Sequence, residues 1–563
     1  MSYTVSEFIT LRLKQLGCRH VFGVPGTSCS DFIDALMADE DMHFINTVNE
    51  LEAGYAADGY GRQGALGAVT VAYGVGTLSM ANGIASALTE RVPLIVINGG
   101  PTDKDWRIEA EYDVRFSHGT GFGKTDLKVF ASLALAAEEI RTLDNAAAII
   151  DELLTTAIEG SGPVYLEIPQ NLWKQPIGEF SPNLQYTPKR FTAGQAQFNH
   201  TAHSLLRTAT RPVVLLGAEL IRFGLVEEAM RFVEFQQLPF YTTMLSKSLV
   251  SEDHPLFCGV YDSDLAPSTI TQGVESADAV IALGCLFGID HRHLVVTLGN
   301  KLCRVAYHKA MQGKTVLPAL SLGAALETLN ALPLLNTTAR HIPSVAGLSY
   351  VERRAQWQGK LARKPFGLGH DDIFAAIGEF ITEVTAPYYV CLDTCLASFP
   401  GADIPLTDVQ CFLANPVWLS IGQGTPAALG AHFATGKRPL IVTGDGGFQM
   451  VAQTFSTFVK YNIPAIIVII DNGSYAIEQF LIDESFFTKP DVEALPYVLL
   501  NGWKYENMPH VYNGGLGLRV TDYAGLLGAL NYAHARPDQP CVIAAQIPMK
   551  DLPAENRRFL GLE

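Results

Sequence analysis

Short apolar runs, each bounded by proline, glycine or aspartate, recur along the whole chain. Runs of this length and composition are typical of strands buried in a parallel sheet. Longer helix-like stretches separate them, and this alternation favours an α/β fold. The predicted strands lie at residues 93–100, 163–169, 212–217, 277–284, 387–393, 438–446, 464–472 and 540–548.

The length of the chain predicts about three domains, because 563 residues are too many for one hydrophobic core. Two stretches have the composition of linkers: residues 170–200 contain several prolines, and residues 337–370 are polar and charged. We expect each domain to be an open doubly wound parallel sheet, which binds ligands at the carboxyl ends of its strands. The expected domains are 1–180, 195–340 and 365–563.

The composition excludes several classes of protein. A net charge of −17 would repel phosphate backbones, so nucleic acid is not an expected partner. The strongest apolar run, residues 464–470, is too short to cross a membrane as a helix, and the N-terminus lacks the pattern of a signal peptide. The cysteines are scattered and include no CxxC pair, which fits a reducing compartment. We therefore expect a cytoplasmic protein with no membrane partner.

A glycine-rich turn is predicted after the strand 438–446. Asp445 lies within Gly444-Asp445-Gly446-Gly447, and Asn472 follows it by 27 residues at the end of the predicted strand 464–472. A helix is predicted over residues 448–462, and its N-terminus would favour an anion such as a diphosphate beside the turn. The side-chain oxygens of Asp445 and Asn472 suit Mg²⁺. Taken alone, each segment is more often an ordinary tight turn or loop than a binding site.

The GDG sequence and the asparagine at this spacing together resemble the thiamine diphosphate binding motif, and the chain resembles that enzyme superfamily from end to end. The resemblance implies thiamine diphosphate and Mg²⁺ as cofactors, with the backbone carbonyl of Ser474 as a third metal ligand. It also implies that residues 1–180 bind the pyrimidine ring, that 195–340 form a central domain and that 365–563 bind the diphosphate and the metal.

A second motif begins at Asn49-Glu50, in NELEAGYAADGYGR. A glutamate that opens a helix is by itself most often a solvated or capping residue. The stretch resembles the pyrimidine-domain signature of thiamine enzymes, in which the glutamate protonates N1′ of the aminopyrimidine. Such a group is needed because an imino nitrogen removes the weakly acidic C2 proton of the thiazolium only while a buried carboxyl supports that tautomer.

The resemblance assigns further residues to the cofactor. Ile421 matches the bulky residue that wedges between the two cofactor rings, although alone it would be an ordinary core isoleucine. In the superfamily Glu50 and the GDG site come from different subunits, which implies at least a homodimer, with a homotetramer expected. The other expected cofactor contacts are Thr394, Leu419, Gly446, Gly447 and Ile477.

Within the superfamily the chain resembles the pyruvate and indolepyruvate decarboxylases. Glu478 falls where those enzymes carry an active-site glutamate that assists protonation and product release. The segments that carry the resemblance are FGVPG (22–26), YGVGTLSMANGIA (73–85), GKTD (123–126), GPVYLEIPQN (162–171), SYAIEQ (474–479) and the closing IPMKDLPAENRRFLG.

Three proton-handling groups of those decarboxylases are replaced here. Thr27 stands where they have an aspartate, and Gly119 and Thr120 align with their His-His pair. His118 is a candidate to replace one imidazole, although a lone histidine near a loop is more often structural. The expected catalytic residues are Glu50, Glu478 and His118. The residues expected to line the substrate pocket are Thr27, Ser28, Thr120 and Glu478.

These replacements lead to a functional prediction. The resemblance implies that a 2-oxo acid such as pyruvate loses carbon dioxide on the cofactor and leaves an enamine, which a well-placed acid protonates to an aldehyde. Without three such groups, general-acid help of about 10²- to 10⁴-fold per group is lost. The sequence therefore favours ligation of the enamine to a second carbonyl compound, which forms an acyloin.

Other functions stay open at this point. A simple decarboxylase would release the aldehyde, and an acetolactate synthase-like enzyme would bind a flavin in the central domain. A non-catalytic cofactor-binding homologue would be expected to lose Glu50, Asp445 or Asn472, and all three are present. A nicotinamide dehydrogenase is disfavoured, because the nearest GxGxxG candidate, at residues 74–76, lacks the third glycine in register.

Overall fold

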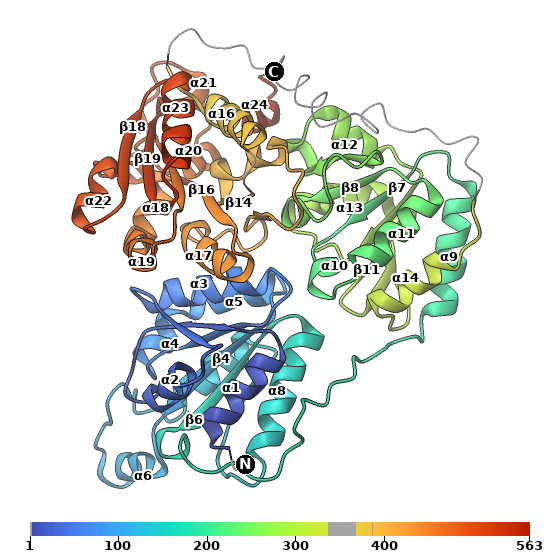
Figure 1. Cartoon of the computed structure of the whole chain (residues 1–563). Helices are drawn as coiled ribbons and strands as arrows, with labels where there is room; N and C mark the ends of the chain where they lie inside the picture. Colours follow the sequence, from blue (N-terminus) through green and yellow to red (C-terminus); the bar gives the residue numbers. More distant parts are fainter. Residues whose placement is uncertain (1–2, 336–366, 385–386, 563) are drawn as a thin grey trace. The chain divides into compact units, whose positions relative to one another are not determined.

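The computed structural model describes residues 3–335, 367–384 and 387–562. Contacts divide the chain into two compact units, one of Met1–Lys189 with Pro426–Gly436 and one of Arg190–Thr425 with Lys437–Glu563. The described residues form one sheet in the first unit and two in the second (Figure 1). The predicted α/β fold with three sheets is confirmed, whereas the limits predicted for three domains stay a prediction.

The first sheet is entirely parallel, with the strand order β2-β1-β3-β4-β6-β5. The predicted strands at 93–100 and 163–169 are β4 and β6, and every residue in them is buried, which explains their unbroken apolar sequences. The strands are β1 His20–Gly23, β2 His43–Asn46, β3 Gly67–Thr70, β4 Leu94–Gly100, β5 Ala136–Glu139 and β6 Pro163–Pro169.

Helices pack on both faces of this sheet. α1 contacts α2 and α8, whereas α3 contacts α5, so the helices form two layers. α1 begins where the Thr4 and Glu7 side chains form a capping box with each other's backbone N–H groups. The helices are α1 Val5–Gln15, α2 Ser30–Met37, α3 Glu50–Gly61, α4 Val75–Ser79, α5 Ala81–Thr89, α6 Asp103–Tyr112, α7 Thr125–Leu133 and α8 Ala146–Gly160.

The first predicted linker, 170–200, opens with a 3₁₀ turn, Gln170–Leu172, and ends in α9 of the second unit. Between these elements the described chain forms no named strand or helix, as its prolines predict. The second predicted linker, 337–370, lies outside the described residues except for 367–370.

The second sheet has the strand order β13-β12-β11-β10-β7-β8-β9. β12 and β13 are antiparallel and form one edge, so this sheet is mixed rather than wholly parallel as predicted. The strands are β7 Pro212–Leu216, β8 Phe240–Thr243, β9 Phe257–Tyr261, β10 Ala279–Leu283, β11 Leu302–Ala306, β12 Lys309–Gln312 and β13 Thr315–Val316. The helices are α9 Gln195–Thr208, α10 Glu219–Arg222, α11 Val226–Gln236, α12 Ser268–Glu275, α13 Arg292–Leu298 and α14 Leu322–Asn330.

The third sheet is parallel, with the strand order β15-β14-β16-β17-β19-β18. The four strands predicted in this part of the sequence are β14, β16, β17 and β19. The strands are β14 Tyr388–Leu392, β15 Phe412–Leu413, β16 Arg438–Gly444, β17 Ile466–Asp471, β18 Leu516–Val520 and β19 Cys541–Gln546. The helices are α16 His370–Glu383, α18 Asp445–Val451, α19 Thr454–Lys460, α20 Ala476–Ile482, α21 Ser485–Thr488, α22 Met508–Val511, α23 Tyr523–His534 and α24 Ala554–Phe559. The helix α17 Gly424–Thr435 also lies in this stretch of sequence, but most of it belongs to the first unit.

The prediction of a single helix over residues 448–462 is wrong in detail, because two short helices occupy this stretch. α18 begins at Asp445 itself, and Ala452 and Gln453 separate it from α19. Both of these residues keep right-handed helical dihedral angles. The apolar spacing therefore identified helical backbone without revealing the interruption.

The first and third sheets have the same strand order, although their sequences show no repeat. In each, the second strand lies on one side of the first and the third strand on the other. The order therefore reverses between β1 and β3 and again between β14 and β16, and open α/β sheets bind ligands outside the carboxyl ends of such strands. In the described parts of the chain, no helix is both long and apolar enough to cross a membrane.

Candidate functional site

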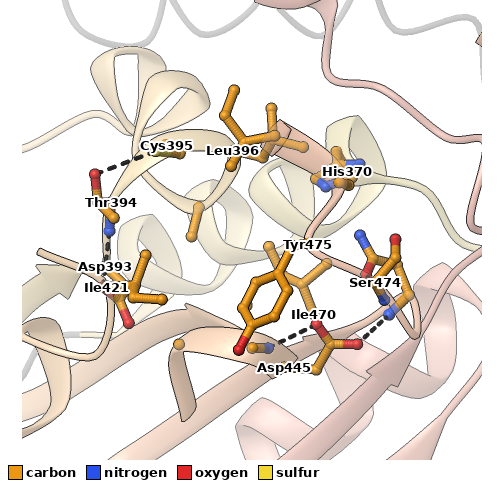
Figure 2. Close-up of a pocket in the computed structure, with 17 residues that line it drawn as sticks. His370, Asp393, Thr394, Cys395, Leu396, Ile421, Asp445, Ile470, Ser474 and Tyr475 are labelled. Atoms are coloured by element: carbon orange, nitrogen blue, oxygen red, sulfur yellow. Dashed lines mark hydrogen bonds between the residues drawn. The ribbon is translucent and has the colours of Figure 1, made fainter. Parts of the chain in front are cut away.

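A pocket opens at the carboxyl ends of β14, β16 and β17 in the second unit (Figure 2). It therefore lies at the place where the strand order of the third sheet reverses. Its walls come from segments far apart in the sequence. They comprise residues 393–397 after β14, 444–447 after β16, Asn472 and 474–477 after β17, together with His370, Ile421 and Ile470.

Asp445 joins two walls of this pocket. Its Oδ1 accepts the backbone N–H of Gly446 at 2.8 Å, and its Oδ2 accepts those of Asn472 at 3.1 Å and Gly473 at 2.6 Å. The residue is 2% exposed, and this burial raises the pKa of its carboxyl to about 7 against the opposing effect of the N–H donors. The side chain thus fixes the GDGG turn against the loop after β17.

Asn472 and Ser474 form a turn beside this carboxylate. The Asn472 Oδ1 accepts the backbone N–H of Ser474 at 3.0 Å, and Gly473 between them adopts a φ of +75° that favours glycine. The structure therefore brings together the three residues predicted as metal ligands.

Gly446 and Gly447 are required by close approaches of neighbouring groups. A Cβ at Gly446 would collide with the ring of Tyr475, and a Cβ at Gly447 would lie 2.5 Å from Oδ2 of Asp393. Their absent side chains therefore leave the backbone of the turn directly against the pocket wall.

Asp393 holds the loop that carries Ile421. Its carboxylate accepts the Thr443 hydroxyl at 2.7 Å and the backbone N–H groups of Thr394 at 2.9 Å and Gly422 at 3.0 Å. Burial raises the pKa of this carboxyl, while the donors lower it. Ile421 lines the pocket as predicted. Leu419, with a φ of +58°, is not among the lining residues, so its predicted cofactor contact gains no support from this pocket.

Thr394, Cys395 and Ile477 line the pocket, whereas Glu478 does not. Burial is the main cause that raises the pKa of the Cys395 thiol to about 11, and the charges of Asp393, Glu478 and Asp290 add to it. Glu478 is an exposed residue in the first turn of α20, and its negative charge helps to raise the pKa of that thiol.

In the first unit, Glu50 and His118 lie beside the same glycine-containing segment. Glu50 is the first residue of α3, and a Cβ at Gly76 would lie 3.4 Å from its Cγ. A Cβ at Gly74 would lie 3.0 Å from the Cβ of His118. The start of α4 therefore packs against both predicted catalytic residues.

Of the predicted substrate-pocket residues of this unit, Thr27 and Ser28 lie on the loop after β1, and Thr120 lies between α6 and α7. The Thr27 carbonyl accepts Nε2 of Gln170 at 3.1 Å, and the Ser28 carbonyl accepts Nε1 of Trp173 at 2.7 Å. The Thr120 hydroxyl is hydrogen-bonded to that of Thr125. The side chains of Thr27, His118 and Thr120 are exposed, and their roles stay predictions.

Comparisons with known proteins identify the family. Models of thiamine pyrophosphate enzymes match the chain in three places: the N-terminal TPP binding domain at residues 3–118, the central domain at 200–332 and the C-terminal TPP binding domain at 399–545. Pyruvate decarboxylase 1 of Pisum sativum is 31% identical over 536 residues, which cover 91% of this chain and 84% of that protein. The chain belongs to the thiamine-diphosphate-dependent enzymes.

Further relatives of this thiamine-diphosphate-dependent enzyme carry related names. An alpha-keto-acid decarboxylase of Mycolicibacterium paratuberculosis is 28% identical over 571 residues, with 98% of this chain and 95% of that protein covered. One of Mycobacterium tuberculosis is 27% identical over 569 residues, with 99% and 96% covered. The chain is thus a member of the 2-oxo acid decarboxylase family, as its sequence resemblance predicted.

Asp393 and His370 are among the residues that line the pocket of this enzyme but that the sequence did not single out. Asp393 ends the predicted strand 387–393, and a carboxylate at the carboxyl end of a buried strand is a signal that could have found it. His370 begins α16, and no local pattern marks it. Both lie before the stretch that matches the C-terminal family model.

Proposed function

We propose that the enzyme decarboxylates a 2-oxo acid such as pyruvate and ligates the remaining fragment to a second carbonyl compound, with thiamine diphosphate and Mg²⁺ as cofactors. The bonded set of Asp445, Asn472 and Ser474, inside a thiamine pyrophosphate enzyme fold, is the observation that carries this proposal. When bound, thiamine diphosphate supplies an electron sink beside the carboxylate that leaves as carbon dioxide.

The pocket fits a magnesium ion that is held together with a diphosphate. The described residues contain no group of three His, Cys, Asp or Glu side chains that could hold a metal by themselves. Asp445, the Asn472 amide oxygen and the Ser474 carbonyl are hard oxygen ligands, and Mg²⁺ combines few such ligands with phosphate oxygens. We therefore assign these three residues to the metal and Gly446 and Gly447 to the space beside the diphosphate.

Glu50 is assigned to the aminopyrimidine, where its carboxyl holds a proton at N1′. Its place at the start of α3, packed beside Gly76, keeps the side chain at the carboxyl edge of the first sheet. Because Glu50 and Asp445 lie in different units, and because family members pair these sites across subunits, we propose a homodimer or homotetramer. All nine cysteines are free thiols, which supports the proposed cytoplasmic location.

Ligation is favoured over aldehyde release because three proton-handling groups of the decarboxylases that the chain resembles are replaced here. Thr27, Gly119 and Thr120 carry no acidic or imidazole group, and each lost general acid costs about 10²- to 10⁴-fold in proton transfer. Glu478 and His118 are the assigned proton carriers. With fewer donors, the fragment left after decarboxylation persists long enough to attack a second carbonyl compound.

A simple decarboxylase that releases an aldehyde is the second candidate. It is favoured by the position of the Asp290 carboxyl, which could supply an acid. The loop after β10 carries Asp290, and a Cβ at Gly288 in that loop would be in van der Waals contact with Val417, 3.7 Å away. The charge of Asp290 acts on the Cys395 thiol, as does that of Glu478. Burial raises the pKa of Asp290, which suits a carboxyl that donates a proton.

An acetolactate synthase-like enzyme with a flavin is disfavoured by the central sheet. The strand order there reverses between β7 and β10, where a dinucleotide would bind. Gly217 and Gly284, which follow these strands, pack so closely that a Cβ on Gly217 would collide with the Gly284 carbonyl. Glu219 lies fully buried beside them, and its carboxylate would repel a diphosphate.

The deciding experiment is product analysis of the holoenzyme with a panel of 2-oxo acids, with and without aldehyde or ketone acceptors. The proposal predicts acyloins as major products when an acceptor is in excess. Aldehyde as the sole product across the panel would support the second candidate, and absence of any turnover would support a non-catalytic homologue.

A further inference from the structure

His370 is held by the C-terminal segment at the wall of the cofactor pocket. Its ring Nδ1 lies 2.9 Å from Oδ2 of Asp551, and its backbone N–H donates to the same oxygen at 2.7 Å. Gly369 packs on that carboxylate too, since a Cβ there would lie 3.0 Å from both oxygens. Asp551 therefore fixes both the start of α16 and the orientation of the imidazole.

This arrangement leaves Nε2 as the ring nitrogen available to the pocket. His370 is 1% exposed and lines the pocket, where Figure 2 shows it on the same side as Ser474. No hydrogen bond to a described residue is found for Nε2. This nitrogen is therefore open to a partner that enters the pocket, because the described residues supply none.

The charges of the pocket indicate what that partner is. Of the 17 lining residues, His370 is the single one whose side chain can carry a positive charge, and Asp393 and Asp445 are carboxylates. A diphosphate brings several further negative charges. Magnesium offsets only part of them, so an imidazolium at the pocket wall would stabilise a bound diphosphate.

We propose that a bound diphosphate holds His370 as the imidazolium, whose Nε2–H donates to a phosphate oxygen of the cofactor while its Nδ1–H donates to Asp551, the positioning residue that holds the ring. The inference rests on the proposed function, because it requires a diphosphate in this pocket. Asp371 accepts the backbone N–H of Ala554 at 2.9 Å and pairs with Arg557 at 2.6 Å. The phosphate contact thus connects the cofactor to a C-terminal segment that is fastened at two adjacent residues.

The test measures ligand affinity rather than turnover. Dissociation constants of thiamine diphosphate, inorganic pyrophosphate and thiamine are measured by calorimetry at fixed Mg²⁺ for the wild type and for His370→Leu. Loss of a charge-assisted hydrogen bond should lower the affinity for thiamine diphosphate and for pyrophosphate about tenfold or more. The affinity for thiamine should not change. Equal weakening of thiamine, or unchanged affinity for all three ligands, would overturn the inference.

Two further variants separate a direct contact from a structural one. Asp551→Asn should weaken the two phosphate ligands less than His370→Leu and also spare thiamine. His534→Leu is the control, since this histidine bonds the Tyr388 hydroxyl at 2.8 Å away from the pocket lining, and it should leave all three affinities unchanged.

A variant that does not fold and a wild type that binds no cofactor lead to different conclusions. If His370→Leu does not fold, His370→Gln retains a neutral donor and should show a smaller loss that is still confined to the phosphate ligands; a loss shared by thiamine contradicts the inference. A wild type that binds no thiamine diphosphate would instead refute the proposed function.

Discussion

The carboxylate of Asp445 accepts the backbone N–H of Gly473 at 2.6 Å, and this bond joins the end of β16 to the turn after β17. The two halves of the GDG and asparagine motif are therefore one hydrogen-bonded structure. Their spacing in the sequence carries more information than either half alone, because it corresponds to one helical crossover between neighbouring parallel strands.

Replacement of Asp445 by alanine should abolish cofactor retention. The change removes a proposed metal ligand and also leaves the N–H groups of Asn472 and Gly473 without their acceptor. Loss of groups that only support a ligand typically costs 10- to 100-fold in metal affinity, so loss of the ligand should cost about 100-fold or more. The measurement is calorimetric titration with thiamine diphosphate and Mg²⁺.

Asp471→Asn provides the matched control for that titration. Asp471 directly precedes Asn472 but pairs with Arg519 at 2.7 Å instead of lining the pocket. Its replacement should leave cofactor affinity within a few-fold of the wild type. Full retention of thiamine diphosphate by Asp445→Ala after Mg²⁺ is removed would refute the metal assignment.

Glu50→Gln should keep the fold and the bound cofactor but lose most activity. The amide retains the shape of the side chain and cannot exchange a proton with N1′, so a loss of about 10²- to 10⁴-fold is expected. Hydrogen–deuterium exchange at C2 of the bound cofactor, followed by NMR after acid quench, measures the affected step directly. Exchange at the wild-type rate would exclude this role. A fully active monomer in solution would contradict the proposed sharing of sites between subunits.

Much of this enzyme could be predicted from its sequence because the informative contacts are local or periodic. Buried parallel strands leave unbroken apolar runs, so β4, β6, β16 and β17 were found. The pairing of His370 with Asp551 joins residues 181 positions apart, and no local pattern encodes such a contact. The break between α18 and α19 was missed for a different reason, since apolar periodicity continues across it.

Glu167→Gln should change how stability depends on pH. Burial raises the pKa of Glu167, at 1% exposure, from 4.5 to about 7, and the Tyr165 hydroxyl donates to it at 2.9 Å. Between these pH values the folded protein keeps a proton that the unfolded chain has lost, so wild-type stability falls as pH rises from about 4.5 to 7. The free energy of unfolding should fall by at most about 3 kcal/mol over this pH range.

Glutamine does not ionise, so this fall should be absent from the variant. The melting temperature of Glu167→Gln relative to the wild type should therefore rise between pH 5 and pH 8. Glu152→Gln, on the exposed face of α8, is the control and should follow the wild type. A constant difference between Glu167→Gln and the wild type across this range would show that Glu167 does not titrate there.

Asp290→Asn tests whether the loop after β10 supplies an acid. If Asp290 protonates the fragment left after decarboxylation, its removal should increase the ratio of acyloin to aldehyde, by up to about 10²-fold for one general acid. The exposed Asp264, in the neighbouring turn Ser263–Leu265, is the control, and Asp264→Asn should leave the ratio unchanged. An unchanged ratio in Asp290→Asn would show that Asp290 is not the acid, and the simple decarboxylase would lose its support.

The last prediction concerns Glu478, the acid that the chain shares with the decarboxylases it resembles. Glu478→Gln should slow turnover by about 10²-fold and shift the products further from aldehyde toward acyloin, because proton transfer limits aldehyde release more than it limits ligation. His118→Ala should do less, since His118 is exposed and contacts the loop at Gly74 chiefly through its backbone. The product ratio is measured by mass spectrometry with one 2-oxo acid and an excess of acceptor. A Glu478→Gln variant that makes relatively more aldehyde would show that this carboxyl promotes ligation, and the assignment of Glu478 as the principal proton donor would then be wrong.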